Sequence, residues 1–347
     1  MTSDSPLIPI CKLHLPEIDL WLDPSRGKPL AVISHAHSDH VASHGKAICS
    51  VATSALLRGR YGQKGEHVVL EYGETHEIGG YRLELLPAGH ILGSSMVHVT
   101  RLSDGATLLY TGDFKLRPSP TCEAPQVKQA DTLIMETTFG LPRYVFPSYS
   151  VIQEQVVRWC RVALESGRVP ILQGYSLGKA QEILQLLQGG GFKISVHETV
   201  GNICAVYERC GVTFPGYEFL NSNDTTGRVL VIPPNASRPE GKQFVSAMIS
   251  GWGMDPRAKY RSRTEEVFPL SDHADYPDLL KLVEKVRPRV TYTTHGFAAE
   301  FARDLRERGW TAWTLEGRDQ LDLGLVFEPS SQTEWLRGGL SGGMSSR

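Results

Sequence analysis

Residues 32–44 read VISHAHSDHVASH, and His35, His37 and His40 surround Asp39 within six residues of this stretch. The chain has 12 histidines in 347 residues, and a quarter of them lie between His35 and His40. The preceding residues 30–34, LAVIS, form a short apolar run with β-branched side chains, which predicts a buried strand. A strand that leads into the cluster favours a functional site over a solvated histidine-rich loop or histidines that cap a helix.

The spacing within this cluster suits metal binding from a loop. A helical zinc site places its histidines at i and i+4, whereas His35, His37 and Asp39 lie two residues apart and His40 follows at once. In a loop, alternate side chains can face one metal ion and adjacent ones a second. A catalytic zinc takes about three protein ligands and keeps one position open. Four candidate ligands in one segment therefore favour a two-metal site.

Further candidate ligands follow apolar strand patterns elsewhere in the chain. His90 follows LLPAG, Asp113 follows LLYTG, His295 follows TYTT, and His273 lies within PLSDHAD. Each is weak alone, because an aspartate beside a glycine is usually a turn residue and a single histidine usually serves the surface or the core. Together with the first cluster they form a consistent ligand set.

Composition narrows the class of protein. Apolar residues make up 41% of the chain, charged residues 21%, and the net charge is −2, so any phosphate binding must come from a local patch or from metal ions. The six cysteines are scattered without a C-x-x-C pair, which argues against a zinc knuckle and favours a reducing compartment. We found no signal peptide and no apolar run near the ~20 residues of a membrane span. We therefore expect a cytoplasmic protein without a membrane partner.

Periodicity predicts an α/β protein with an insertion. Period-two alternation through residues 81–110 predicts antiparallel strands, and residues 131–136 predict a further buried strand that ends at Glu136. From about Ser148, helical and strand patterns alternate, as in a separate α/β domain. The predicted segments are 1–147, an inserted domain at 148–262, a completing part at 263–328, and a disordered tail at 329–347.

These motifs resemble those of the metallo-β-lactamase fold. SHAHSDH, PAGH and YTGD, preceded by LWLDP, occur in the order typical of that fold. METTFG, SDHAD and TTHG resemble the three additional motifs of its β-CASP nucleic-acid-processing branch. The resemblance implies an αββα sandwich, built from the first and the completing segments, with the β-CASP domain inserted between them. It also implies that Asp23 is the buried aspartate that braces the histidine loop.

Within this branch, GDFKLRPSP, ETTFGLPRYVFPS and GYSLGKAQE are most similar to SNM1-type DNA exonucleases, especially bacterial ones encoded alongside a DNA ligase. The resemblance covers roughly residues 20–325. It implies a 5′-to-3′ DNA exonuclease that leaves 5′-phosphate products, prefers single-stranded DNA to RNA, and works in DNA repair with a ligase and a helicase. His295 departs from eukaryotic SNM1-type enzymes and is typical of the RNA-processing branch, so an RNase J-like endo- or exonuclease is the alternative.

The resemblance further implies two zinc sites that share one aspartate. One zinc would take His35, His37, His90 and Asp113, and the second would take Asp39, His40, His295 and Asp113. Imidazole and carboxylate ligands suit Zn²⁺ and also admit Mn²⁺. Two such ions hold the oxygens of a phosphodiester and lower the pKa of a bridging water to about 7.

Three residues are predicted to carry the chemistry: the shared Asp113, with His273 and Glu136. The leaving oxygen needs a proton, and His273 is the candidate general acid, oriented and kept charged by Glu136. Two alternatives stay open for His273: it is a metal ligand, or it is a polar group at the start of a helix.

Substrate contacts are predicted at a strand-to-helix turn. Ser176, Gly178 and Lys179 lie there, where free amide donors favour a phosphate, although an ordinary helix cap gives the same pattern. The alternating charges of residues 257–263 would share one face of a strand and follow a nucleic-acid backbone, or protect a sheet edge. Trp252, between two glycines, stacks a base or fills a packing site.

Two other function classes fit less well. A small-molecule hydrolase of the lactamase or glyoxalase type would not need the insertion or the pair of Glu136 and His273. A catalytically inactive nucleic-acid-binding protein would not need a complete ligand set.

Overall fold

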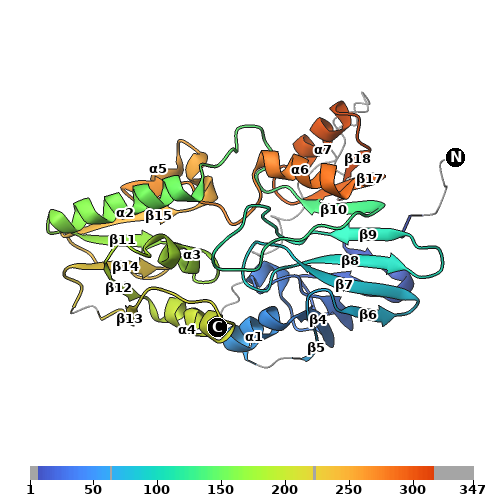
Figure 1. Cartoon of the computed structure of the whole chain (residues 1–347), viewed down its shortest axis with the longest axis horizontal. Helices are drawn as coiled ribbons and strands as arrows, with labels where there is room; N and C mark the ends of the chain where they lie inside the picture. The colour runs from blue at the N-terminus through green and yellow to red at the C-terminus, as the bar shows by residue number, and fades with distance from the viewer. Residues whose placement is uncertain (1–6, 63–64, 222–223, 316–347) are drawn as a thin grey trace, which may run out of the picture.

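The computed structural model describes residues 7–62, 65–221 and 224–315 (Figure 1). Two sheets pack face to face in the part of the molecule that carries the histidine loop. The first has the order β1-β2-β3-β4-β5, with strands His14–Leu15, Leu20–Leu22, Leu30–Val32, Lys46–Ser50 and Glu66–Leu70. Side chains of both sheets, including Val32 and Ile48 of the first and Leu83 and Val97 of the second, form one buried core.

The second sheet has the order β18-β17-β10-β9-β8-β7-β6. In chain order its strands are Thr75–Ile78, Tyr81–Pro87, Ser95–Arg101, Thr107–Tyr110, Thr132–Glu136, Val290–Thr294 and Ala312–Thr314. The predicted antiparallel strands are confirmed, because β7, β8 and β9 pair in that way. β10 runs parallel to both β9 and β17 and is buried along its whole length, so it delivers Glu136 to the carboxyl edge of the sheet.

Helices cover the outer faces of these two sheets. α1 (Val51–Tyr61) packs Leu56 and Leu57 against Ala47 and Cys49 of the first sheet. On the second sheet lie α6 (Tyr276–Val286) and α7 (Ala298–Glu307), whose apolar faces join Leu133 and its neighbours in one core. Short 3₁₀ turns occur at Pro16–Ile18, Ser38–His40 and Gly251–Met254. The layers are helix, sheet, sheet, helix, and the predicted αββα sandwich is confirmed.

A third, fully parallel sheet is built from the chain between β10 and α6 (Figure 1). Its order is β13-β12-β14-β11-β15-β16. The strands are Val169–Gln173, Lys193–Val196, Tyr217–Phe219, Arg228–Ile232, Phe244–Ile249 and Glu266–Phe268, and the helices are α2 (Tyr149–Glu165), α3 (Lys179–Leu186), α4 (Glu198–Arg209) and α5 (Ala258–Ser262). Because β16 belongs to this sheet, the sheet continues past the predicted boundary at residue 262.

The charged stretch at residues 257–263 is not a strand, so that prediction was wrong. Residues 258–262 form α5, and its charges find local acidic partners: Lys259 pairs with Glu266 at 2.8 Å and Arg261 with Asp255 at 2.9 Å. Alternating charges without β-branched neighbours fit a short helix equally well. The four basic side chains therefore do not form a single strand face.

Two further expectations concern the ends and the membrane. The predicted disordered tail at 329–347, and the completing segment beyond residue 315, lie outside the described residues. Within the part of the chain that the structure describes, no helix is both long enough and apolar enough to cross a membrane.

Candidate metal centre

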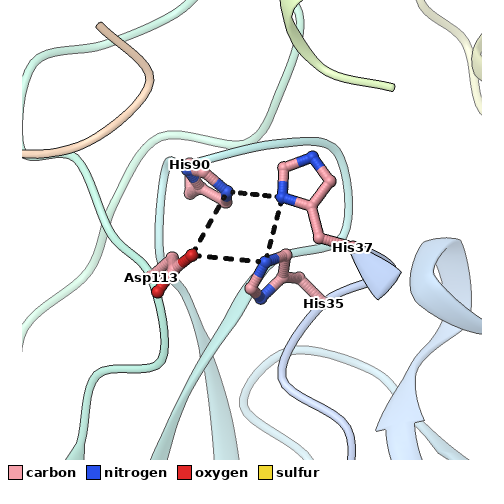
Figure 2. Close-up of side chains that lie close together, drawn as sticks. All are labelled: His35, His37, His90 and Asp113. Atoms are coloured by element: carbon pink, nitrogen blue, oxygen red, sulfur yellow. Dashed lines mark hydrogen bonds and ion pairs between the residues drawn. The ribbon is translucent and has the colours of Figure 1, made fainter. Parts of the chain in front are cut away.

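Four predicted ligands converge at the edge where strands of the two packed sheets end (Figure 2). His35 and His37 follow β3, His90 follows β7, and Asp113 follows β9. Their facing atoms, one from each side chain, all lie within 4.8 Å of one another. Segments far apart in sequence meet here because each is held by a buried strand.

The spacing of these atoms fits a single tetrahedral ion. His37 Nδ1 lies 3.1 Å from both His35 Nε2 and His90 Nε2. Asp113 Oδ2 lies 3.5 Å from His35 Nε2 and 3.9 Å from His90 Nε2. Ligands about 2.0–2.1 Å from zinc in a tetrahedron are roughly 3.3 Å apart. The four side chains therefore already have nearly the separation that zinc requires.

In each of the three rings, the nitrogen that points away from the other ligands contacts a neighbouring oxygen. His37 Nε2 donates to Leu177 O at 3.1 Å, and His90 Nδ1 donates to Asp272 O at 2.9 Å. His35 Nδ1 lies 3.0 Å from Ser34 Oγ. In neutral imidazole only one nitrogen carries a proton, so the inner nitrogens of His37 and His90 present lone pairs to each other. Facing lone pairs are well placed to bind a cation between them, and such contacts of the other ring nitrogen are typical of metal-bound histidines.

The protonation states of these rings also suit metal binding. Burial, with neighbouring imidazoles, lowers the pKa of His37 and of His90 to about 4 each. Burial and the neighbouring His40 hold the pKa of His35 well below its usual value. All three rings are therefore neutral at pH 7, which is the form that binds a metal.

The second predicted ligand set lines one cavity of about 680 Å³. Asp39, His40, Asp113 and His295 all face it. His40 Nε2 lies 3.4 Å from Asp113 Oδ2 and 3.7 Å from Asp39 Oδ2, and the rings of His40 and His295 are 6.0 Å apart. Asp113 Oδ2 thus lies between the two sets, as a shared ligand would.

The buried Asp23 carboxylate binds both His40 and the histidine loop at Ser34. Its Oδ2 lies 2.9 Å from His40 Nδ1 and accepts from Tyr110 Oη at 2.8 Å, while its Oδ1 accepts from Ser34 N at 2.6 Å. Burial opposes charge on His40, but Asp23 and Asp113 outweigh it and raise its pKa well above the usual value. A proton on His40 Nε2 thus stands where the second ligand set would hold a cation.

His273 lines the same cavity and is paired with Glu136. Its Nδ1 lies 2.8 Å from Glu136 Oε1, and its ring lies 4.6 Å from that of His90. Glu136 is buried and also accepts from Phe114 N and from Thr138 Oγ1. Burial lowers the pKa of His273, but the carboxylate outweighs it and raises the pKa to about 10. The ring is therefore protonated at neutral pH.

Of the three residues predicted to contact substrate at the strand-to-helix turn, one lines the cavity and two do not. Ser176 lines the cavity. Gly178 has a φ of +86°, and a Cβ there would lie 2.4 Å from Ile91 Cγ2 and 3.7 Å from His37 Nε2, so a glycine lets this turn approach the ligand loop. Lys179 is buried and paired with Glu182 at 2.6 Å and with Asp272 at 3.4 Å. Lys179 is not among the residues that line the cavity.

Sequence reasoning missed the buried charge network around Lys179. Lys115 Nζ pairs with Glu182 Oε1 at 2.8 Å, and Glu182 Oε2 pairs with Lys179 Nζ, which reaches Asp272. Asp272 in turn supplies the carbonyl that binds His90. The network connects α3 to the candidate ligand His90. The only sequence signal was Lys179 and Glu182 at i and i+3 of one helix.

Replacing Lys179 with methionine is expected to lower the free energy of unfolding by about 3–5 kcal/mol, because a buried negative charge loses its partner. Glu182 keeps its pair with Lys115, so the charge left without a partner is that of Asp272. The double variant K179M/D272N removes one charge of each sign and should lose less than the single variant. Urea denaturation of both variants measures this difference. Equal losses in the two variants would contradict the proposed charge coupling.

Comparisons with known proteins agree with this architecture. Residues 260–315 match the RMMBL family, described as "Zn-dependent metallo-hydrolase RNA specificity domain". The chain is 41% identical over 322 residues to a protein of Opitutus terrae named "Probable DNA ligase", covering 91% of this chain and 32% of that protein. It is 31% identical over 292 residues to the Arabidopsis thaliana "DNA cross-link repair protein SNM1", covering 74% of this chain and 58% of that protein.

The chain thus spans about a third of the first relative and just over half of the second. Among solved structures, a protein of unknown function from Enterococcus faecalis V583 is similar over 81% of this chain and 78% of that chain, with a TM-score of 0.57 and 14% sequence identity. That likeness shows a shared fold.

Proposed function

We propose that this chain, which has the β-CASP metallo-β-lactamase fold, is a metal-dependent DNA exonuclease. It degrades DNA from the 5′ end and leaves 5′-phosphate products, in DNA repair. The observation that carries this proposal is His273, which is paired with Glu136 and lines the cavity that the second ligand set also lines.

Two zinc ions fit the proposed ligand sets, with Mn²⁺ as a substitute. The first set is His35, His37, His90 and Asp113, and the second is Asp39, His40, His295 and Asp113. When bound, the ions would supply Lewis-acid stabilisation of the phosphate charge and a water of lowered pKa. Asp23 binds Nδ1 of His40, which leaves Nε2 of that ring directed toward the second ligand set.

The chain's own side chains handle the proton of the leaving group. His273 holds its proton at neutral pH, because Glu136 binds Nδ1 and leaves Nε2 for the leaving oxygen. The third sheet contributes Tyr175, Ser176 and Asn235 to the cavity wall. A long polymer can therefore lie between the two parts of the molecule, and Ser176 is positioned to contact its backbone.

Names of relatives support DNA as the substrate. The Opitutus terrae relative is named "Probable DNA ligase" and is much longer than this chain. We therefore propose a functional partnership with a DNA ligase and a helicase during repair, on single-stranded DNA. We also propose a cytoplasmic location, which the six free cysteines favour because thiols persist in reducing compartments.

RNA is the second candidate substrate. The description of the matching family names RNA specificity, and His295, a member of the second ligand set, matches the histidine that is typical of the RNA-processing branch. An RNase J-like endo- or exonuclease is therefore the alternative function.

Incubation of zinc-loaded protein with 5′- and 3′-labelled single-stranded DNA and matched RNA separates these candidates. We expect early release of the 5′ label as mononucleotide from DNA, with RNA degraded more slowly. Earlier loss of the 3′ label would contradict the polarity. Degradation confined to RNA would replace the DNA proposal with the RNA one.

A further inference from the structure

A second cavity adjoins the one that contains the candidate ligands. It measures about 560 Å³, and its lining includes Arg143, Tyr144, Tyr175, Trp252 and Phe297. Tyr175 and Trp252 line both cavities, so the two spaces meet at these rings. Anything bound in the first cavity can extend into the second past exposed aromatic surface.

Trp252 is fixed in place yet remains open on the cavity side. Its ring lies 4.9 Å from that of Phe139 and 6.0 Å from that of Tyr144, and 41% of the residue is exposed. The adjacent glycine, Gly251, allows this seating, because a Cβ there would lie 2.6 Å from Phe139 Cζ. Phe139 also contacts His273, at 6.2 Å between ring centroids. Trp252 is thus two ring contacts from the proposed general acid.

The cavity also contains a second exposed aromatic ring, Tyr175, and the positively charged guanidinium of Arg143. Tyr175, at the junction, is 68% exposed. The guanidinium of Arg143 lies 4.9 Å from the Tyr144 ring and 5.6 Å from the Phe297 ring, and it donates to Tyr144 Oη at 3.2 Å. An oriented guanidinium recognises phosphate oxygens well. Exposed aromatic rings beside a cation are the combination that binds single-stranded nucleic acid without sequence preference.

We propose that this cavity is a stacking subsite for the base of a nucleotide next to the cleaved phosphodiester. The base stacks on Trp252, with Tyr175 at the entrance, and Arg143 contacts the adjoining phosphate. This inference rests on the proposed function, since it assumes a nucleic-acid substrate in the first cavity. Stacking uses the flat face that every base has, so the subsite accepts all four bases.

A position scan with abasic nucleotides tests the subsite. Single-stranded DNA is prepared with one abasic residue at each of the first few positions, and kcat/KM is measured for every substrate. One position should lower kcat/KM about tenfold or more, because base stacking on an aromatic side chain is worth ~1–3 kcal/mol. The variant W252L should lose about as much on intact DNA, mainly in KM, and should no longer respond to the abasic residue. W252F, which keeps a ring, should recover part of the loss.

Trp313 supplies the matched control. It is 48% exposed on β18, with the Arg306 guanidinium 5.3 Å from its ring, and it lines neither cavity. W313L should therefore behave as the wild type. Wild-type kinetics in W252L, or an abasic penalty that persists unchanged in W252L, would overturn the subsite while leaving the nuclease proposal intact.

A binding assay keeps the subsite testable without activity. Fluorescence polarisation of labelled single-stranded DNA with the H273A variant measures affinity in the absence of turnover. We expect W252L/H273A to bind intact DNA about tenfold more weakly than H273A, and to bind abasic DNA equally well. Equal binding of intact DNA by both proteins would overturn the subsite. Binding that follows this expectation, without hydrolysis by wild-type protein, would reject only the proposed function.

Discussion

Replacing Asp113 with asparagine is expected to remove bound metal and to lower kcat/KM for DNA hydrolysis by at least about 10³-fold. Asp113 Oδ2 lies 3.4 Å from His40 Nε2 and 3.5 Å from His35 Nε2, so one oxygen serves both ligand sets. Asparagine keeps the shape of the side chain but removes its negative charge. Mutation of a residue that only orients a metal ligand typically lowers metal affinity or activity by about 10–100-fold. Loss of a ligand that two ions share should have a larger effect.

Metal analysis by mass spectrometry, together with kinetics, measures this effect. The matched control is D19N, because the Asp19 side chain is 64% exposed and pairs with His14, away from the ligand sets. The D19N variant should keep wild-type metal content and activity. A D113N protein with normal metal content and normal rates would show that Asp113 is not the shared ligand.

Replacing His273 with alanine is expected to reduce kcat by about 10²–10⁴-fold while metal content stays normal, because this is the usual contribution of general acid catalysis. Its Nδ1 is bound by Glu136, which leaves Nε2 free to donate a proton. The same two measurements, rate and metal content, distinguish the open alternatives. Loss of metal in H273A would instead identify His273 as a ligand.

The pH profile of E136Q provides an independent check on the same pair. The Glu136 carboxylate raises the pKa of His273, against the opposing effect of burial. Without that charge, His273 loses its proton at a lower pH, so the alkaline limb of the rate profile should move to lower pH. The control variant H76A, on the edge strand β6, should keep the wild-type profile. An unshifted limb in E136Q would contradict the role of Glu136.

The positions of the metal-binding candidates could be predicted because each follows a strand with a clear apolar pattern. β3, β7, β9 and β17 end just before His35, His90, Asp113 and His295, respectively. Strands of packed sheets that end at one edge bring such residues together. Periodicity therefore predicted the strands and the candidate positions, whereas the family resemblance implied the αββα sandwich and the assignment of ligands to two ions.

The partners of those ligands could not be predicted in the same way. His37 and His90 are oriented by the carbonyls of Leu177 and Asp272, which lie 140 and 182 residues away. A backbone carbonyl has no side-chain signature, so only the folded chain identifies it. The sequence predicts a substrate contact at Lys179 because it lies with Ser176 and Gly178 at a strand-to-helix turn, whereas in the folded chain its buried side chain pairs with two carboxylates.

Anomalous diffraction at the zinc edge, from crystals grown with zinc, tests the central claim most directly. Two peaks are expected on each chain. One should lie among His35, His37, His90 and Asp113, and the other among Asp39, His40, Asp113 and His295. A single peak, or a second peak bound by His273 instead of His295, would contradict the proposed two-metal centre.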